Sequence, residues 1–315
     1  MAEVRSPMRE WLQLVREDVD PVVYGGAAVV LALVLGVHVG TGAFEPFLRD
    51  PGMVGLLGRS LLFGLPWAVV LALMVARGRA ALSWPLVRMG LAAVAIVSVA
   101  TWFPYHRSVV APLPVPLQGY GRALLWNLKG SALWLGPVVL FWWRYDRGTV
   151  PACYGVTWHE GHRRIYGAAL GVIVLLAVWA SFRADFLSVY PTYRPGVAEA
   201  YLGVSPWLTV GVYELVYGVD FAFVELFFRG FLVIGMARWL GSGAVMPMVA
   251  MYAVAHVGKP LPEVLGSIVG GYVLGMMAVQ SRSIAGGIVL HLGMAWSMEA
   301  AALLQHGVRG TLTAS

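Results

Sequence analysis

The sequence predicts an all-α protein, a polytopic transmembrane helix bundle of about eight to nine spans. Of its 315 residues, 59% are hydrophobic and only 12% are charged, about half the charged share of a soluble domain. The mean hydropathy is +0.74. A soluble domain of this length cannot hide so much apolar surface in its core, so lipid is the expected solvent for most of the chain.

The spans follow from runs of about 20 apolar residues, the length that crosses the hydrocarbon core of a bilayer. The second run ends before Arg77 and Arg79, and the fourth ends before Arg144 and Arg147. The sixth is longer than one span, and short turns separate the last three. The candidate spans are 22–43, 57–76, 86–104, 121–143, 164–183, 205–238, 244–258, 262–281 and 284–306.

The charged residues predict a location and exclude one class of partner. The net charge of +6 comes from 20 Arg and 2 Lys, but they are scattered, so no patch for nucleic acid is expected. More of the Arg residues fall on the side of the N-terminus, which favours a cytoplasmic N-terminus. We expect an integral protein of a bacterial cytoplasmic membrane, with lipids as its surroundings. The single cysteine, Cys153, excludes an internal disulfide.

The two parts of the chain differ in their ionisable residues. Residues 1–200 are predicted to form N-terminal membrane helices. Residues 307–315 are predicted to be a polar C-terminal tail. Residues 201–306 are the expected catalytic core, because their spans carry several acids and histidines. Charged groups inside a membrane are costly, so a cluster of them predicts a functional site.

The first motif is the segment Glu225-Leu-Phe-Phe-Arg229-Gly230. Glu225 and Arg229 are four residues apart, so they share one face of a helix and can pair. Where water is excluded, a guanidinium group that binds a carboxylate through two hydrogen bonds keeps the carboxylate ionised. A purely structural ion pair that locks two helices is the alternative interpretation.

Two histidines form the second and third motifs. His256 ends one apolar span, and His291 lies near one end of the last span. A neutral imidazole accepts a proton from water or binds a divalent metal near pH 7. Glu225, His256 and His291 together would be an ordinary zinc set, so a divalent metal such as zinc is one expected cofactor. A lone histidine on an apolar helix is more often a packing residue.

Glu263 and Glu160 are two further acidic positions in the sequence. Glu263 follows Pro262 and is either a residue of a helix's first turn, where the dipole favours an acid, or a second catalytic carboxylate. The His159-Glu160-Gly161-His162 segment does not have the spacing of a helical zinc box, and a solvated loop is the better interpretation.

The three motifs resemble the CAAX-protease and bacteriocin-processing (Abi) family of intramembrane peptidases. Its pattern is Glu-Glu-x-x-x-Arg, then an aromatic-x-x-x-His, then His-x-x-x-Asn or Asp. Glu225 to Arg229, Tyr252 to His256, and His291 match it in the right order over about residues 205–300. The resemblance implies peptide hydrolysis by an activated water, with a metallo- or glutamic mechanism unresolved, and a peptide or protein substrate.

Two positions depart from that pattern. Val224 stands where the family has its first Glu, and Ala295 stands where it has Asn or Asp. Asp220 lies one helical turn before Val224 and Glu263 follows the second motif, so both are candidate substitutes. Glu299 is eight residues after His291 and cannot take the place of residue 295.

Three functions therefore compete. The leading one is an intramembrane endopeptidase using Glu225, His256 and His291, with Glu263 assisting and Arg229 and Asp220 supporting. The second is a catalytically degenerate scaffold or binding protein, for which Val224 and Ala295 argue. The third is a transporter or proton relay, because buried Glu and His also form proton paths.

Overall fold

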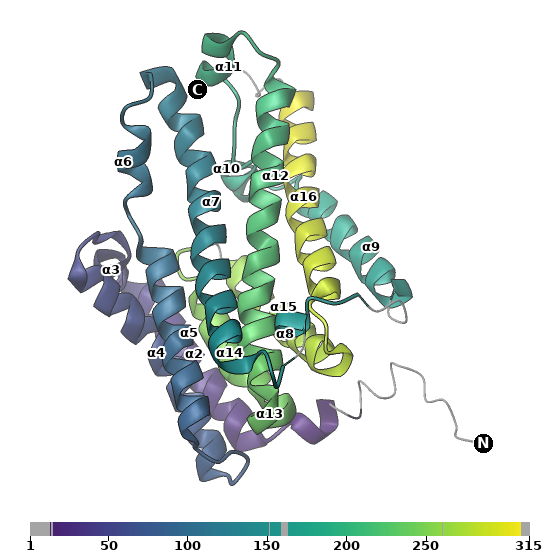
Figure 1. Ribbon diagram of the computed structural model, residues 1–315. Coiled ribbons are helices and arrows are strands. Elements are labelled where there is room, and N and C mark those ends of the chain that lie inside the picture. Colours follow the sequence, from purple (N-terminus) through teal and green to yellow (C-terminus); the bar gives the residue numbers. More distant parts are fainter. Residues whose placement is uncertain (1–12, 14, 151, 159–162, 260, 310–315) are drawn as a thin grey trace. The chain divides into compact units, whose positions relative to one another are not determined.

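The computed structural model describes residues 13, 15–150, 152–158, 163–259 and 261–309 (Figure 1). Helices make up 82% of it, and the described residues form no strand. This confirms the predicted all-α polytopic bundle. Residues 159–162, which hold the His-Glu segment, and 310–315 of the predicted tail lie outside the described residues.

Within the described part of the chain, six helices are long and apolar enough to cross a membrane. A 30 Å hydrocarbon core requires about 20 residues of helix, and each of these helices has about that length or more. They are α2 (Pro21–Thr41), α4 (Met53–Ala76), α5 (Trp84–Trp102), α7 (Val115–Phe141), α15 (Leu261–Ser281) and α16 (Ala285–Val308). The protein is therefore an integral membrane protein.

The other predicted spans take different forms. The run 164–183 is α9 (Arg163–Ala180), and 205–238 is α12 (Pro206–Glu225) followed directly by the π-helix η3 (Leu226–Gly235). The run 244–258 holds only α14 (Val245–Val254), whose ten residues are all buried. At 1.5 Å per residue α14 is about 15 Å long, too short to cross. A continuous apolar run does not distinguish a lipid-facing span from a helix buried in protein.

The chain folds into two compact units, and three of the boundaries between them fall inside continuous helices, α7, α12 and α16. The first contains residues 1–103, 133–159 and 225–287, and the second contains 104–132, 160–224 and 288–315. Each unit thus combines segments from both parts of the sequence. The division into a 1–200 region and a 201–306 catalytic core remains a prediction about function.

The first unit is built around α14. Its neighbours are α2, α4, α15 and η3, while α5 and the short α3 (Glu45–Arg49) pack on α4. Buried on all sides, α14 needs no polar face. The remaining short elements of this unit are η1 (Trp142–Asp146), α8 (Ala152–Gly155), α13 (Ala237–Leu240) and η4 (Gly241–Ala244).

Asp20 begins α2 and ties it to the end of α4. Its Oδ1 accepts hydrogen bonds from the backbone N–H groups of Val22 (3.0 Å) and Val23 (3.2 Å), which is the geometry of an N-cap. Its Oδ2 lies 3.3 Å from Arg77 Nε and 3.8 Å from Arg79 Nη1. Burial raises the pKa of Asp20, but the backbone hydrogen bonds and Arg77 outweigh it and lower the pKa below its ordinary value.

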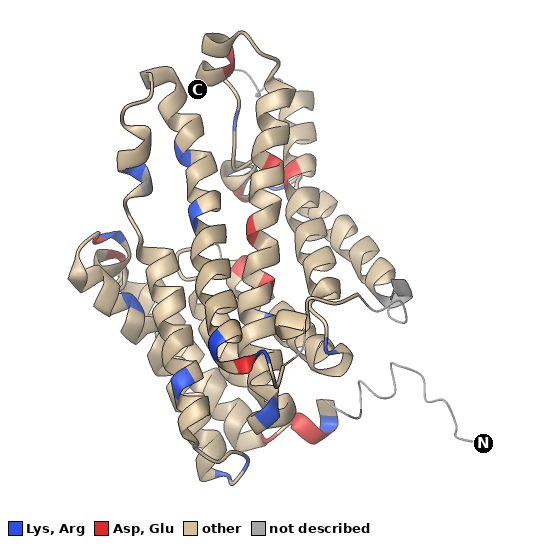
Figure 2. Ribbon diagram, viewed as in Figure 1, with Lys and Arg blue, Asp and Glu red and all other residues tan. Residues whose placement is uncertain are grey.

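The second unit contains the first part of α7, α9, α12 and most of α16. Its shorter helices are α6 (His106–Val110), α10 (Ala184–Val189) and α11 (Val197–Leu202). One apolar cluster joins α10 and α16 through Leu187, Tyr190 and Ala302. A second gathers Tyr193, Val210 and Tyr213. Acidic residues occur along α12 itself and not only at its ends (Figure 2).

Candidate active site

Glu225 and Arg229 form a buried ion pair at the junction of α12 and η3. Glu225 is the last residue of α12, and Arg229 lies in the first turn of η3. Arg229 Nη1 is 2.9 Å from Glu225 Oε1, with side-chain exposures of 1% and 0%. The predicted pair is therefore present. π-Helical segments are rare in proteins, and those that do occur are often found at functional sites.

Gly230 permits another segment of the first unit to touch this π-helix. A methyl group at Gly230 would lie 3.0 Å from the backbone oxygen of Tyr154 and 3.2 Å from its Cβ. Tyr154 is fully buried and donates a 2.6 Å hydrogen bond to Asp146 Oδ2. Its φ of 61°, like the φ of 50° at Ala152 and 45° at Cys153, is left-handed. These conformations are unfavourable for non-glycine residues, so tertiary contacts hold the turn against η3.

Tyr252 connects the first motif to the second. The Arg229 guanidinium lies 4.3 Å from the centre of the Tyr252 ring, within the range of a cation–π interaction. The Tyr252 ring in turn meets the His256 ring edge to face, 4.6 Å between centres. Tyr252 enters the sequence pattern only as an aromatic residue; that it lies between Arg229 and His256 follows from the packing of η3 against α14.

The hydrogen bond of His256 fixes which ring nitrogen carries the proton. His256 Nδ1 is 2.9 Å from the backbone oxygen of Tyr252. A carbonyl oxygen can only accept, so Nδ1 is the donor in this bond. In the neutral ring Nε2 is then the acceptor, the form that takes a proton from water or ligates a metal. His256 is half-buried, at the turn that follows α14.

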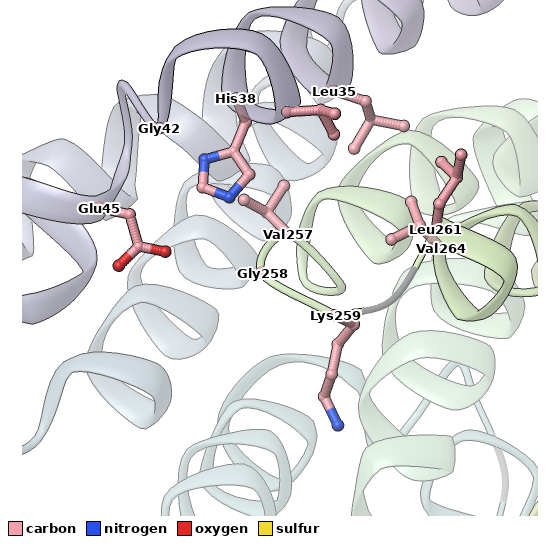
Figure 3. Close-up of a pocket in the computed structure, with 10 residues that line it drawn as sticks. Leu35, His38, Gly42, Glu45, Val257, Gly258, Lys259, Leu261 and Val264 are labelled. Carbon is pink, nitrogen blue, oxygen red and sulfur yellow. The ribbon is translucent and has the colours of Figure 1, made fainter. Parts of the chain in front are cut away.

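Glu263 lies in the first turn of α15, as the sequence predicts, and is paired. Its Oε1 is 3.3 Å from Lys259 Nζ, and its side chain is 26% exposed. The loop between α14 and α15, which carries Lys259, borders a cavity of about 340 Å³. In Figure 3 His38 and Val257 lie beside this space, while Lys259 points away from both. Its lining residues are Leu35, His38, Val39, Gly42, Glu45, Val257, Gly258, Lys259, Leu261 and Val264.

His291 and Asp220 belong to the second unit. His291, on α16, is 6% exposed and its ring centre lies 4.6 Å from that of Phe221. Asp220, on α12, accepts a 3.4 Å hydrogen bond from Ser131. A methyl group at Gly130 would lie 2.6 Å from Asp220 Oδ1, so α7 approaches this carboxylate closely.

The two residues that depart from the family pattern are both apolar. Val224 is half-buried on α12 and Ala295 is buried on α16. Glu299, also on α16, is 1% exposed. Both of its carboxylate oxygens accept from the backbone N–H of Thr192, at 3.1 and 3.0 Å. Glu299 thus holds the segment after α10, in keeping with the expectation that it does not replace residue 295.

Metal binding by the predicted set stays a prediction. Across the described residues, no group of three or more His, Cys, Asp or Glu side chains is arranged to hold a metal ion. Glu225 is paired with Arg229, and His256 is hydrogen-bonded to the Tyr252 backbone oxygen.

Residues 203–297 match the family described as Type II CAAX prenyl endopeptidase Rce1-like. The match contains all three motifs and confirms the predicted resemblance of this part of the chain to the CAAX-protease family. Searches of the curated proteins and of the solved structures found no match.

Proposed function

We propose that this protein is an intramembrane endopeptidase that activates water with Glu225, His256 and His291. The proposal rests on the match of residues 203–297 to the Rce1-like endopeptidase family. The observation that carries the proposal is the continuous contact from Glu225 through Arg229 and Tyr252 to His256. Two of the three family motifs thereby meet inside one buried cluster.

The roles of Arg229 and His256 are supported by their contacts. Arg229 holds the Glu225 carboxylate ionised and in place. His256, with Nε2 as its acceptor, takes a proton from the attacking water. The resulting hydroxide adds to the peptide carbonyl carbon, the C–N bond then breaks, and the imidazolium returns the proton to the leaving amine. His291 is assigned by its place in the third motif, and Glu263 and Asp220 are candidates for the carboxylate that Val224 lacks.

The cavity beside the α14–α15 loop is the proposed binding place for an apolar substrate side chain. Its residues Val257 and Gly258 directly follow His256, and Leu261 and Val264 flank Glu263. At about 340 Å³ it lies at the lower end of the range for small-ligand sites. Its apolar surface comes from Leu35, Val39, Val257, Leu261 and Val264, and this part of the wall is the proposed contact for the side chain; His38, Glu45 and Lys259 supply the polar part.

The test is cleavage of membrane-anchored peptides by the purified protein in lipid nanodiscs. We expect His256→Gln and Glu225→Gln to abolish cleavage, while the matched control His306→Gln leaves it unchanged. His306 lies in the second unit, where its ring contacts the backbone oxygens of Leu187 and Tyr190. Full activity in Glu225→Gln would end the proteolytic interpretation of the first motif.

Two arms of the same experiment separate the competing mechanisms and functions. A metalloenzyme loses activity with a chelator and regains it with added zinc, whereas water activation by Glu and His alone is indifferent to both. Val224 and Ala295 favour the scaffold alternative, which predicts that peptides bind and crosslink to the wild type without being cut. A proton relay predicts proton flux in liposomes with neither binding nor cleavage.

A further inference from the structure

Gly287 lies where a side chain would collide with the Glu225 carboxylate. It is the third residue of α16, and a methyl group built on it would lie less than 3.0 Å from Glu225 Oε2 and 3.3 Å from Cδ. In protein structures, Cβ atoms essentially never come within 3.0 Å of an atom to which they are not bonded. A side chain at position 287 would therefore require either the Glu225 carboxylate or the first turn of α16 to shift.

The carboxylate cannot easily move away from an added methyl group. Glu225 is 0% exposed, and its other oxygen, Oε1, is 2.9 Å from Arg229. Arg229 is itself 1% exposed and lies over the Tyr252 ring. A displacement of Glu225 would therefore break a buried ion pair or push a packed guanidinium. Two glycines on α15, Gly266 and Gly270, differ, because nothing lies within 4 Å of a methyl group built on them.

The first turn of a helix is also a favourable place for an anion. Its N–H groups lack partners within the helix, and they carry the positive end of the helix dipole. In α16 the Ser283 hydroxyl caps the N–H of Ala285 at 3.1 Å, and Gly287 is two residues further along. Glu225 thus has a cation on one side and a helix N-terminal turn on the other.

We propose that Gly287 is a positioning residue for Glu225: its missing side chain lets the first turn of α16 press against the carboxylate and fix it opposite Arg229. As far as catalysis is concerned, this rests on the proposed function, because Glu225 must act on water for its position to matter. The contact itself does not depend on any activity.

The contact is tested first by thermal stability in a double-mutant cycle. Gly287→Ala should lower the melting temperature by several degrees in the wild-type background. In the background Glu225→Ala with Arg229→Leu, which removes both members of the ion pair, the same change should cost nothing or should raise it, since Ala is a better helix former than Gly. Gly270→Ala is the matched control and should have the same small effect in both backgrounds. An equal loss from Gly287→Ala in both backgrounds would overturn the proposal.

The catalytic consequence is tested on the folded variants. Gly287→Ala should lower kcat about 100-fold, the order of loss that misplacing a group by about 1 Å can cause, with KM changed far less. In Glu225→Asp the shorter acid leaves room for the methyl group, so Gly287→Ala should lower kcat far less in that background than in the wild type. A wild type without cleavage refutes the proposed function but leaves the stability cycle intact, whereas unchanged kcat in stable Gly287→Ala refutes positioning.

Discussion

Replacing Arg229 by Ala should destabilise the folded protein and not only reduce its activity. The change leaves the Glu225 carboxylate, at 0% exposure, without its cation. Removing one partner of a buried ion pair costs about 3–5 kcal/mol, and the contact between Arg229 and the Tyr252 ring at 4.3 Å is lost as well. At 2–4 °C per kcal/mol for a domain of 150–250 residues, the melting temperature should fall by roughly 6–20 °C.

The measurement is a thermal melt of purified protein in detergent, followed by intrinsic fluorescence and checked by size-exclusion chromatography. Arg49→Ala is the matched control, because Arg49 also pairs with a Glu four residues away, Glu45, at 2.7 Å, but is 82% exposed. That surface pair should be worth about 0.5 kcal/mol or less.

A second comparison separates stranded charge from lost packing. The double variant Glu225→Leu/Arg229→Leu removes both charges, and replacing a complete buried pair by apolar groups is often neutral. It should therefore melt higher than Arg229→Ala alone. The reasoning is refuted if Arg229→Ala melts as the wild type does, or if the double variant is the less stable of the two. Normal stability with lost cleavage would assign Arg229 to catalysis.

Three further outcomes are expected. Gly230→Ala should lower stability by about 1–3 kcal/mol, because its methyl group would lie 3.0 Å from the Tyr154 backbone oxygen; thermal melts measure this, and an unchanged melt contradicts the close packing. Val264→Trp, on the cavity wall, should raise KM for peptides with bulky apolar residues and spare those with alanine; equal kinetics on both would remove the cavity from the substrate path. Asp20 has a lowered pKa, so it stabilises the fold above its ordinary pKa and loses this contribution as the pH falls through the lower folded value; melts from pH 7 to pH 3 should therefore converge between wild type and Asp20→Asn, and a gap that widens toward acid would give the opposite sign.

The sequence alone determined that this is a helical membrane protein and which part of the chain resembles the CAAX-protease family. Composition and runs of 20 apolar residues act locally, so they identify a span without knowledge of its neighbours. The Glu225–Arg229 pair is likewise predictable, because four residues along one helix bring two side chains together. The order of the three motifs predicted the resemblance to the CAAX-protease family, and the match of residues 203–297 confirms that resemblance.

The tertiary structure decided what depends on segments far apart in the chain. The run 244–258 proved to contain a ten-residue buried helix, because an apolar run looks the same whether lipid or protein surrounds it. Glu299 is held by Thr192, 107 residues away. The approach of Gly287 to Glu225 joins positions 62 residues apart. Local periodicity carries no record of such contacts, since they arise only when helices pack and their backbones reach van der Waals distance.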